Sequence, residues 1–287
     1  MSIKIEIAKL SGYCFGVKRA LEITEKTLKR YSKKNKKVYS IGQIIHNAGV
    51  VDKLKKEGLL VVNDISEIEP DSIFIVRSHG MPLSVLKKLK EKNVKIINTT
   101  CPFVKNAQTK ARMLSKNNYY VVVIGDESHP EVISIVDQIK NKEKLAVISS
   151  PADVDKKINK VQKIGVVMQT TQIKSNAKAI ISELIDKAKK IVIENTICNT
   201  TEKRQNEVKN LAINSELIIV VGGKNSANTT HLANIAKNYN SSVYHIENYR
   251  EINPDWFKGK THIGITGGAS TPKEDIEEVK NYILNIK

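Results

Sequence analysis

Residues 94–114 read VKIINTTCPFVKNAQTKARML, so a short apolar run leads to Cys101 and an amphipathic, helix-like run follows at once. The same order recurs around Cys14, in residues 3–28, and around Cys198, in residues 189–212. These are the only 3 cysteines, and they divide the 287 residues into near thirds. Three thiols on equivalent strand-to-helix turns predict three similar units that direct sulfur toward one centre.

Two further strand–loop–helix units follow each cysteine helix. Strands and helices therefore alternate throughout the chain. The strand runs, such as YVVVIG at residues 120–125 and LIIVVGG at residues 217–223, are short and continuously apolar. This pattern is typical of parallel strands that are buried on both faces. The helical runs place apolar residues three or four positions apart, and one predicted face contains Ile180, Leu184, Ile185 and Ala188.

We therefore predict an α/β protein of three similar units in a pseudo-threefold trefoil around a central cavity. The expected units are residues 14–100, 101–194 and 195–287. Residues 1–13 hold an N-terminal strand that completes or flanks the first unit or belongs to the third. Ligands of parallel α/β units bind beyond the carboxyl ends of the strands, so the loops there should face the cavity.

The three thiols favour a metal centre over a disulfide framework, because their number is odd and no signal peptide is evident at the N-terminus. A structural zinc usually takes four ligands, often from paired C-x-x-C clips, and the sequence has no such clip. A 4Fe-4S cluster with three thiolate ligands would leave one iron open to substrate, whereas most clusters use four cysteines. The alternative is three unrelated core cysteines.

The formal net charge of +17 is compatible with an acidic partner, such as nucleic acid, a phosphorylated metabolite or an acidic redox protein. We favour the interpretation as a lysine-rich solvated surface, because the cations are spread over many helices. Aromatic residues make up only 5% of the chain, which disfavours a platform for stacking bases. No apolar run has the roughly 20 residues of a membrane span, so we expect a cytoplasmic protein.

His46, His79 and His129 each occupy a strand-to-helix loop on the predicted cavity side. Imidazoles beside helix N-termini bind phosphate oxygens, although an isolated histidine is often structural. The remaining loops are rich in hydroxyl and amide groups, at residues 169–171 (QTT), 225–228 (NSAN) and 267–271 (GGAST). Such residues also cap helices, but together they predict a cradle for a phosphate or diphosphate.

Glu131 follows His129 by two residues, in the first turn after Pro130. A carboxyl group among histidines beside an iron centre is suited to proton delivery, with burial tuning its pKa. The alternative is a favourable charge at a helix N-terminus.

Together these motifs resemble the 4-hydroxy-3-methylbut-2-enyl diphosphate reductase family. The matching segments are GYCFGVKRA, GQIIHNAGVV, VRSHG, TTCPFV, SHPEV, QTTQ, ICNTTEKRQ, NSAN and TGGAST, in order from residue 12 to residue 271. The resemblance implies a trefoil of three α/β domains around a 4Fe-4S cluster held by Cys14, Cys101 and Cys198. It implies catalysis by Glu131, Thr170 and His129. The implied substrate-binding residues are His46, His79, His129, Thr170, Ser226, Ala227, Asn228 and Ser270.

Three departures from the family pattern stand out. Gln43 occupies a position where many members have glutamate, and Ala227 one where a second serine is frequent. Residues 133–138 read ISIVDQ, where many members continue with a Gly-Thr segment. The Ala227 change removes one side-chain contact but leaves a backbone N–H. The cysteines and Glu131 match the pattern.

The resemblance implies reductive dehydroxylation of (E)-4-hydroxy-3-methylbut-2-enyl diphosphate to isopentenyl and dimethylallyl diphosphates, with two electrons and two protons. The electrons must come from outside, since no complete G-x-G-x-x-G fingerprint follows a strand. A ferredoxin or flavodoxin with its NADPH reductase is the expected donor. Two alternatives remain: a non-redox, cluster-dependent dehydratase, and a basic nucleic-acid-binding protein that would bind with a steep salt dependence.

Overall fold

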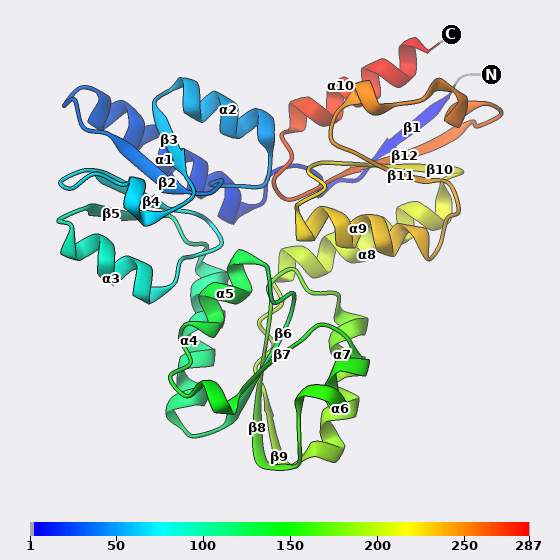
Figure 1. The fold of residues 1–287 in the computed structure, drawn as a ribbon. Coiled ribbons are helices and arrows are strands. Elements are labelled where there is room, and N and C mark those ends of the chain that lie inside the picture. Colours follow the sequence, from blue (N-terminus) through cyan, green and yellow to red (C-terminus); the bar gives the residue numbers. More distant parts are fainter. Residues whose placement is uncertain (1–2, 287) are drawn as a thin grey trace. The chain divides into compact units, whose positions relative to one another are not determined.

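The computed structural model describes residues 3–286 and contains three parallel four-stranded sheets (Figure 1). By their contacts the residues form two compact units. One unit comprises residues 1–17, 46–49 and 199–287, and the other comprises residues 18–45 and 50–198. The larger unit contains two of the sheets and the smaller unit contains the third.

The first sheet of the larger unit has the strand order β3-β2-β4-β5. Its strands are β2 (Val38–Ile41), β3 (Leu59–Val62), β4 (Ile73–Val76) and β5 (Lys95–Asn98). The helices of this part of the chain are α1 (Phe15–Ser32), α2 (Ala48–Lys56) and α3 (Leu83–Glu91). Leu89 of α3 packs in one buried cluster with Phe74 and Val76, so α3 covers one face of this sheet.

The second sheet has the order β7-β6-β8-β9. Its strands are β6 (Tyr120–Ile124), β7 (Leu145–Ile148), β8 (Val161–Met168) and β9 (Ala188–Ile193). Its helices are α4 (Pro102–Lys116), α5 (Pro130–Val136), α6 (Val154–Lys157) and α7 (Lys174–Leu184). Helices α4 and α5 cover one face while α6 and α7 cover the other, which explains the continuously apolar strands (Figure 1).

The third sheet, in the smaller unit, has the order β1-β12-β10-β11. Its strands are β1 (Lys4–Ile7), β10 (Leu217–Val221), β11 (Val243–Ile246) and β12 (His262–Gly267). Its helices are α8 (Asn199–Asn214), α9 (Ala227–Lys237) and α10 (Lys273–Asn285). Ile276, Val279 and Ile283 bury one side of α10 against this sheet.

All three sheets share one topology. From one edge to the other, the first two sheets contain their second, first, third and fourth strands in chain order, and the third sheet has the same order when β10 is counted as its first strand. In the third sheet the fourth place is taken by β1, which pairs in parallel with β12 from Lys4–His262 to Ile7–Ile265. The predicted α/β class and repeated strand–helix pattern are confirmed, and the N-terminal strand belongs to the third sheet. The division into domains at residues 14–100, 101–194 and 195–287 stays a prediction.

The predicted helical face that included Ile185 and Ala188 is wrong at its end. Helix α7 stops at Leu184, a 3₁₀ turn follows, and Ala188 is the first residue of β9. Ile185 is 63% exposed rather than buried. Apolar spacing continues through the turn by chance, so periodicity alone did not locate the boundary.

Among residues 3–286, no helix combines the length and the apolar character needed to cross a membrane.

Replacing Gly165 by alanine should destabilise the second sheet. A Cβ at this position in β8 would lie 2.6 Å from Cδ2 of Leu114, a buried α4 residue. Overpacking of this kind costs about 1–3 kcal/mol, so the melting temperature measured by circular dichroism should fall.

The matched control is Gly49→Ala, in helix α2, where a Cβ would be 3.6 Å from its nearest contact. That variant should keep or slightly raise the melting temperature, since alanine is the better helix former. Equal melting temperatures for Gly165→Ala and the wild type would contradict the packing described here.

Candidate functional site

Each cysteine stands between the fourth strand of one sheet and the helix that begins the next part of the repeat. Cys14 lies between β1 and α1, Cys101 between β5 and α4, and Cys198 between β9 and α8. None of the three forms a disulfide among the described residues, and all are of intermediate burial. The predicted strand-to-helix position of the thiols is thus confirmed.

The backbone amide of each cysteine is held by the loop that follows the third strand of the same sheet. The N–H groups of Cys14, Cys101 and Cys198 donate to carbonyl oxygens at 3.1, 2.9 and 2.9 Å, respectively. The acceptors are Ala269 after β12, Ser78 after β4 and Thr170 after β8. The thiols therefore lie directly beside the polar loops that the sequence singled out.

A cation on each cysteine helix binds the segment that leads to the next cysteine in the repeat. Arg19 Nη1 on α1 donates to the Thr99 and Thr100 carbonyls at 3.3 and 3.4 Å, just before Cys101.

The other two cysteine helices repeat this arrangement. Lys110 on α4 forms an ion pair with Glu194, just before Cys198, at 3.0 Å. Arg204 on α8 donates to Gly12 O at 2.6 Å and to Gly267 O at 3.1 Å. Sequence reasoning missed these three cations, although two of them lie within the quoted segments GVKRA and TEKRQ.

Glu131 and Thr170 form the most deeply buried acidic site in the larger unit. The Glu131 carboxylate is 2% exposed and accepts from Thr170 N at 2.6 Å and from Thr170 Oγ1 at 2.8 Å. Burial raises the pKa of Glu131 to about 7, and the two hydrogen bonds from Thr170 oppose that rise. The carboxyl group therefore exchanges its proton near neutral pH.

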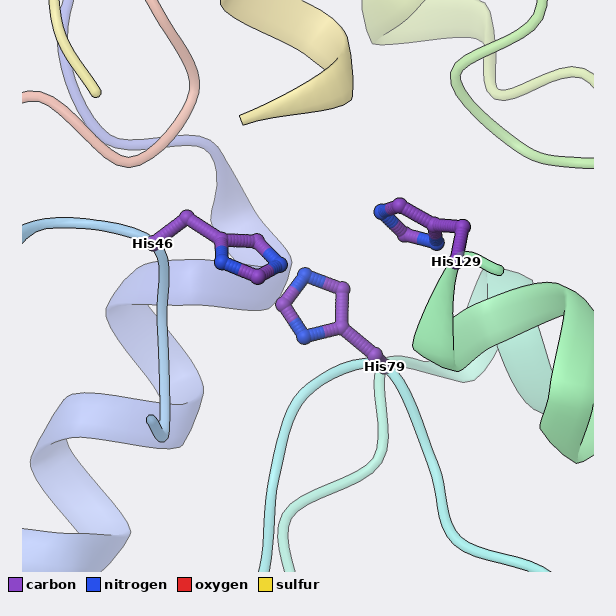
Figure 2. A group of neighbouring side chains, drawn as sticks. All are labelled: His46, His79 and His129. Carbon is purple, nitrogen blue, oxygen red and sulfur yellow. The ribbon is translucent and has the colours of Figure 1, made fainter. Parts of the chain in front are cut away.

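His129 caps the N-terminus of α5, and its Nδ1 accepts from Glu131 N at 3.1 Å. In neutral His129 this bond leaves the ring proton on Nε2, where it is a donor for an anionic oxygen. The His79 ring meets the His129 ring edge-on, with centroids 5.4 Å apart (Figure 2). The loop after β4 and the start of α5 thus bring two of the predicted phosphate ligands together.

In the smaller unit, two predicted loops pack closely through their glycines. Gly222 has φ +137°, and a Cβ there would lie 2.3 Å from Thr271 Oγ1. A Cβ at Gly268 would lie 2.0 Å from Thr229 Oγ1. Only glycine allows this approach, which brings the loop of residues 222–228 against the loop of residues 267–271.

The residues of this unit that are predicted to bind the diphosphate lie in or beside these two loops. Ser270 Oγ donates to the carbonyl of His46 at 3.0 Å, which places His46 in the smaller unit. Ser226 caps α9, and Ala227 is its first residue. Asn228 is 5% exposed, and its Nδ2 has no hydrogen-bond partner within residues 3–286. A buried, unused amide donor is suited to an anionic ligand.

The chain matches the family described as LytB protein over residues 5–284. Two curated relatives, both named 4-hydroxy-3-methylbut-2-enyl diphosphate reductase, illustrate the similarity. The protein from Trichlorobacter lovleyi is 42% identical over 281 residues, which cover 98% of each chain. The protein from Aquifex aeolicus is 39% identical over 285 residues, 99% of this chain and 97% of its own length.

Two solved structures resemble the fold over 99% of this chain. One, described as (E)-4-hydroxy-3-methyl-but-2-enyl diphosphate reductase, the terminal enzyme of the non-mevalonate pathway, is 39% identical, with a TM-score of 0.71 and full coverage of its chain. The other, the E-1-hydroxy-2-methyl-but-2-enyl-4-diphosphate reductase from Plasmodium falciparum, is 27% identical, with a TM-score of 0.92 and 89% coverage of its chain.

The raised pKa of Glu131 should make the stability of the protein depend on pH. Because the pKa of Glu131 in the folded protein, about 7, exceeds the 4.5 of an ordinary glutamate, stability present at low pH is lost as pH rises from 4.5 through 7. In Glu131→Gln this loss is absent. The variant should therefore gain roughly 3 kcal/mol over the wild type between pH 4.5 and pH 8.

Urea unfolding at pH values across this range measures the difference. The control is Glu183→Gln, which removes an exposed carboxyl group on α7 and should not reproduce this gain. A flat difference for Glu131→Gln would show that Glu131 titrates as an ordinary carboxyl group.

Proposed function

The chain belongs to the LytB protein family, and on that premise we propose that it reduces 4-hydroxy-3-methylbut-2-enyl diphosphate. In this reaction two electrons and two protons enter, the allylic C–O bond breaks, and the hydroxyl group leaves as water. The products are isopentenyl and dimethylallyl diphosphates. The curated relatives carry the name of this oxidoreductase, and the buried Glu131–Thr170 pair is the observation on this chain that carries the proposal.

The family implies an iron–sulfur cofactor, and we infer a 4Fe-4S cluster held by Cys14, Cys101 and Cys198. The residues fit such a group, because no cysteine of residues 3–286 is in a disulfide and each precedes a helix whose N-terminus favours a thiolate. Cys14 Sγ also accepts from Val17 N at 3.5 Å. When bound, the cluster would supply electrons and a Lewis-acidic iron for the substrate hydroxyl.

Several groups of the chain are suited to bind the substrate diphosphate. Donors at the N-terminus of α9 and the amide of Asn228 are suited to phosphate oxygens, as are the imidazoles of His79 and His129. The proposed set comprises His46, His79, His129, Thr170, Ser226, Ala227, Asn228 and Ser270, with Ala227 acting through its backbone N–H. Binding energy from the diphosphate would hold the reacting hydroxyl in place.

Glu131 would supply the proton that the leaving hydroxyl needs. Its pKa of about 7 keeps a substantial protonated fraction at neutral pH. The carboxylate lies 2.8 Å from the Thr170 hydroxyl, so Thr170 would orient the acid and pass its proton toward the substrate. His129, bonded to the Glu131 amide, fixes the position of the same turn.

An external protein would deliver the electrons, and the net charge of +17 suits an acidic ferredoxin or flavodoxin with its NADPH reductase. A dehydratase without net reduction would need no such donor. Product analysis with and without reductant distinguishes these two reactions.

Protein purified without oxygen should contain about four irons and four acid-labile sulfides per chain. Cys101→Ser should lower both contents, while Thr109→Ser, exposed on the same helix α4, should keep them. Iron and sulfide analysis with a visible spectrum measures this. Zinc, or no metal after anaerobic reconstitution, would contradict the cluster and favour a basic nucleic-acid-binding protein.

Glu131→Gln should lower turnover by at least about 100-fold, since a positioned general acid typically contributes 10²–10⁴. Iron content and the KM should change little, because the amide keeps the volume of the carboxyl group. The control is Glu127→Gln, a carboxylate that is 73% exposed in the loop just before α5. Near wild-type turnover in Glu131→Gln would remove Glu131 from the proton pathway.

A further inference from the structure

Helix α5 and the residue after it carry two polar side chains, Ser134 and Asp137, that no step above uses. Ser134 is fully buried, although a hydroxyl group is costly to bury unless it is hydrogen-bonded. Both side chains reach from the second sheet's helices to the loop between β4 and α3, which belongs to the first sheet. All these residues lie in the larger unit.

The Ser134 hydroxyl is shared between the backbone carbonyls of two proposed functional residues. Its Oγ lies 3.0 Å from His79 O and 2.7 Å from Glu131 O. It also accepts from Gln108 Nε2 of α4 at 3.0 Å. A hydroxyl group has one proton, which the two carbonyls share as acceptors, while the Gln108 amide donates to the hydroxyl oxygen.

The loop approaches Ser134 closely because Gly80 has no side chain. Gly80 has φ +84°, and a Cβ there would lie 2.9 Å from Ser134 Oγ and 2.6 Å from Gln108 Nε2. The backbone next to His79 is thus pressed against α4 and α5, a geometry that other residues would not allow.

Asp137 holds the far end of the same loop. Helix α3 begins after Pro82, which provides no side-chain cap. Asp137 Oδ2 instead accepts from Leu83 N at 2.6 Å, and Oδ1 accepts from Ser84 Oγ at 3.4 Å. A carboxylate from another sheet's helix therefore caps α3, with the charge that a helix N-terminus favours.

We propose that Ser134 and Asp137 are positioning residues that latch residues 79–84 to α5. The latch fixes His79 relative to His129 and Glu131, so that the phosphate ligand and the proton donor keep one spacing. The catalytic consequence rests on the proposed function, whereas the latch itself does not.

Hydrogen exchange tests the latch without substrate. In Ser134→Ala and Asp137→Ala, amides within residues 79–84 should exchange at least about tenfold faster, because local opening becomes easier. The control is Ser72→Ala, another buried serine whose Oγ donates to a carbonyl, Glu69 O, at 2.6 Å inside the first sheet's own loops. Unchanged exchange in both latch variants would overturn the proposal.

Steady-state kinetics test the positioning of His79. Ser134→Ala should raise the KM for the allylic diphosphate about three- to tenfold, the size expected for one lost hydrogen bond. In a His79→Ala background the same change should add almost nothing, because the group it positions is gone. An equal rise in both backgrounds, or no rise in the first, would overturn a role through His79.

The half-buried Asp137→Ala serves as the second variant if Ser134→Ala does not fold. Its KM should rise in the same way and show the same dependence on His79. A wild type without turnover would contradict the proposed function, and hydrogen exchange would still decide whether the latch exists.

Discussion

One backbone hydrogen bond, repeated in all three sheets, ties each cysteine to the loop after the third strand. It joins Cys14 to Ala269, Cys101 to Ser78 and Cys198 to Thr170. The next residues along those loops include Ser270 and His79, so the same contact positions the cysteines and two of the predicted phosphate-binding residues. Parallel strands make this possible, because all their carboxyl ends lie at one edge of a sheet.

The strength of Glu131 as an acid comes from two opposing effects. Burial disfavours the carboxylate, while the N–H and hydroxyl of Thr170 favour it. Within residues 3–286, no cation forms an ion pair with this carboxylate. A neighbouring lysine or arginine would lower the pKa and remove the proton at neutral pH. The Thr170 carbonyl accepts from the Cys198 amide, so Thr170 positions both the Glu131 carboxyl group and the backbone of Cys198.

Local patterns were enough to predict the strands, the cysteine turns and the polar loops, because apolar runs and loop residues report on their own neighbourhood. Long-range partners left no such signal. The pairing of β1 with β12 joins Lys4 to His262, and the sequence left that strand's place open. No role was predicted for Ser134 and Asp137, which lie in residues 133–138, the segment that differs from the family pattern. Their partners, such as Leu83, lie some fifty residues away in the chain.

The place of β1 has a consequence for how the protein is made. Among the strands of residues 3–286, β1 comes first in the chain, yet the strand that it pairs with, β12, comes last. Contacts so distant in the chain form slowly, and an unpaired strand edge invites association with other chains. The hydrogen bond from the Cys14 amide likewise cannot form before Ala269 has been made. The turns at Cys101 and Cys198 can thus form between segments that are near in the chain, whereas the turn at Cys14 needs the loop after β12, so a centre that used all three thiols would be completed only after β12 has been made.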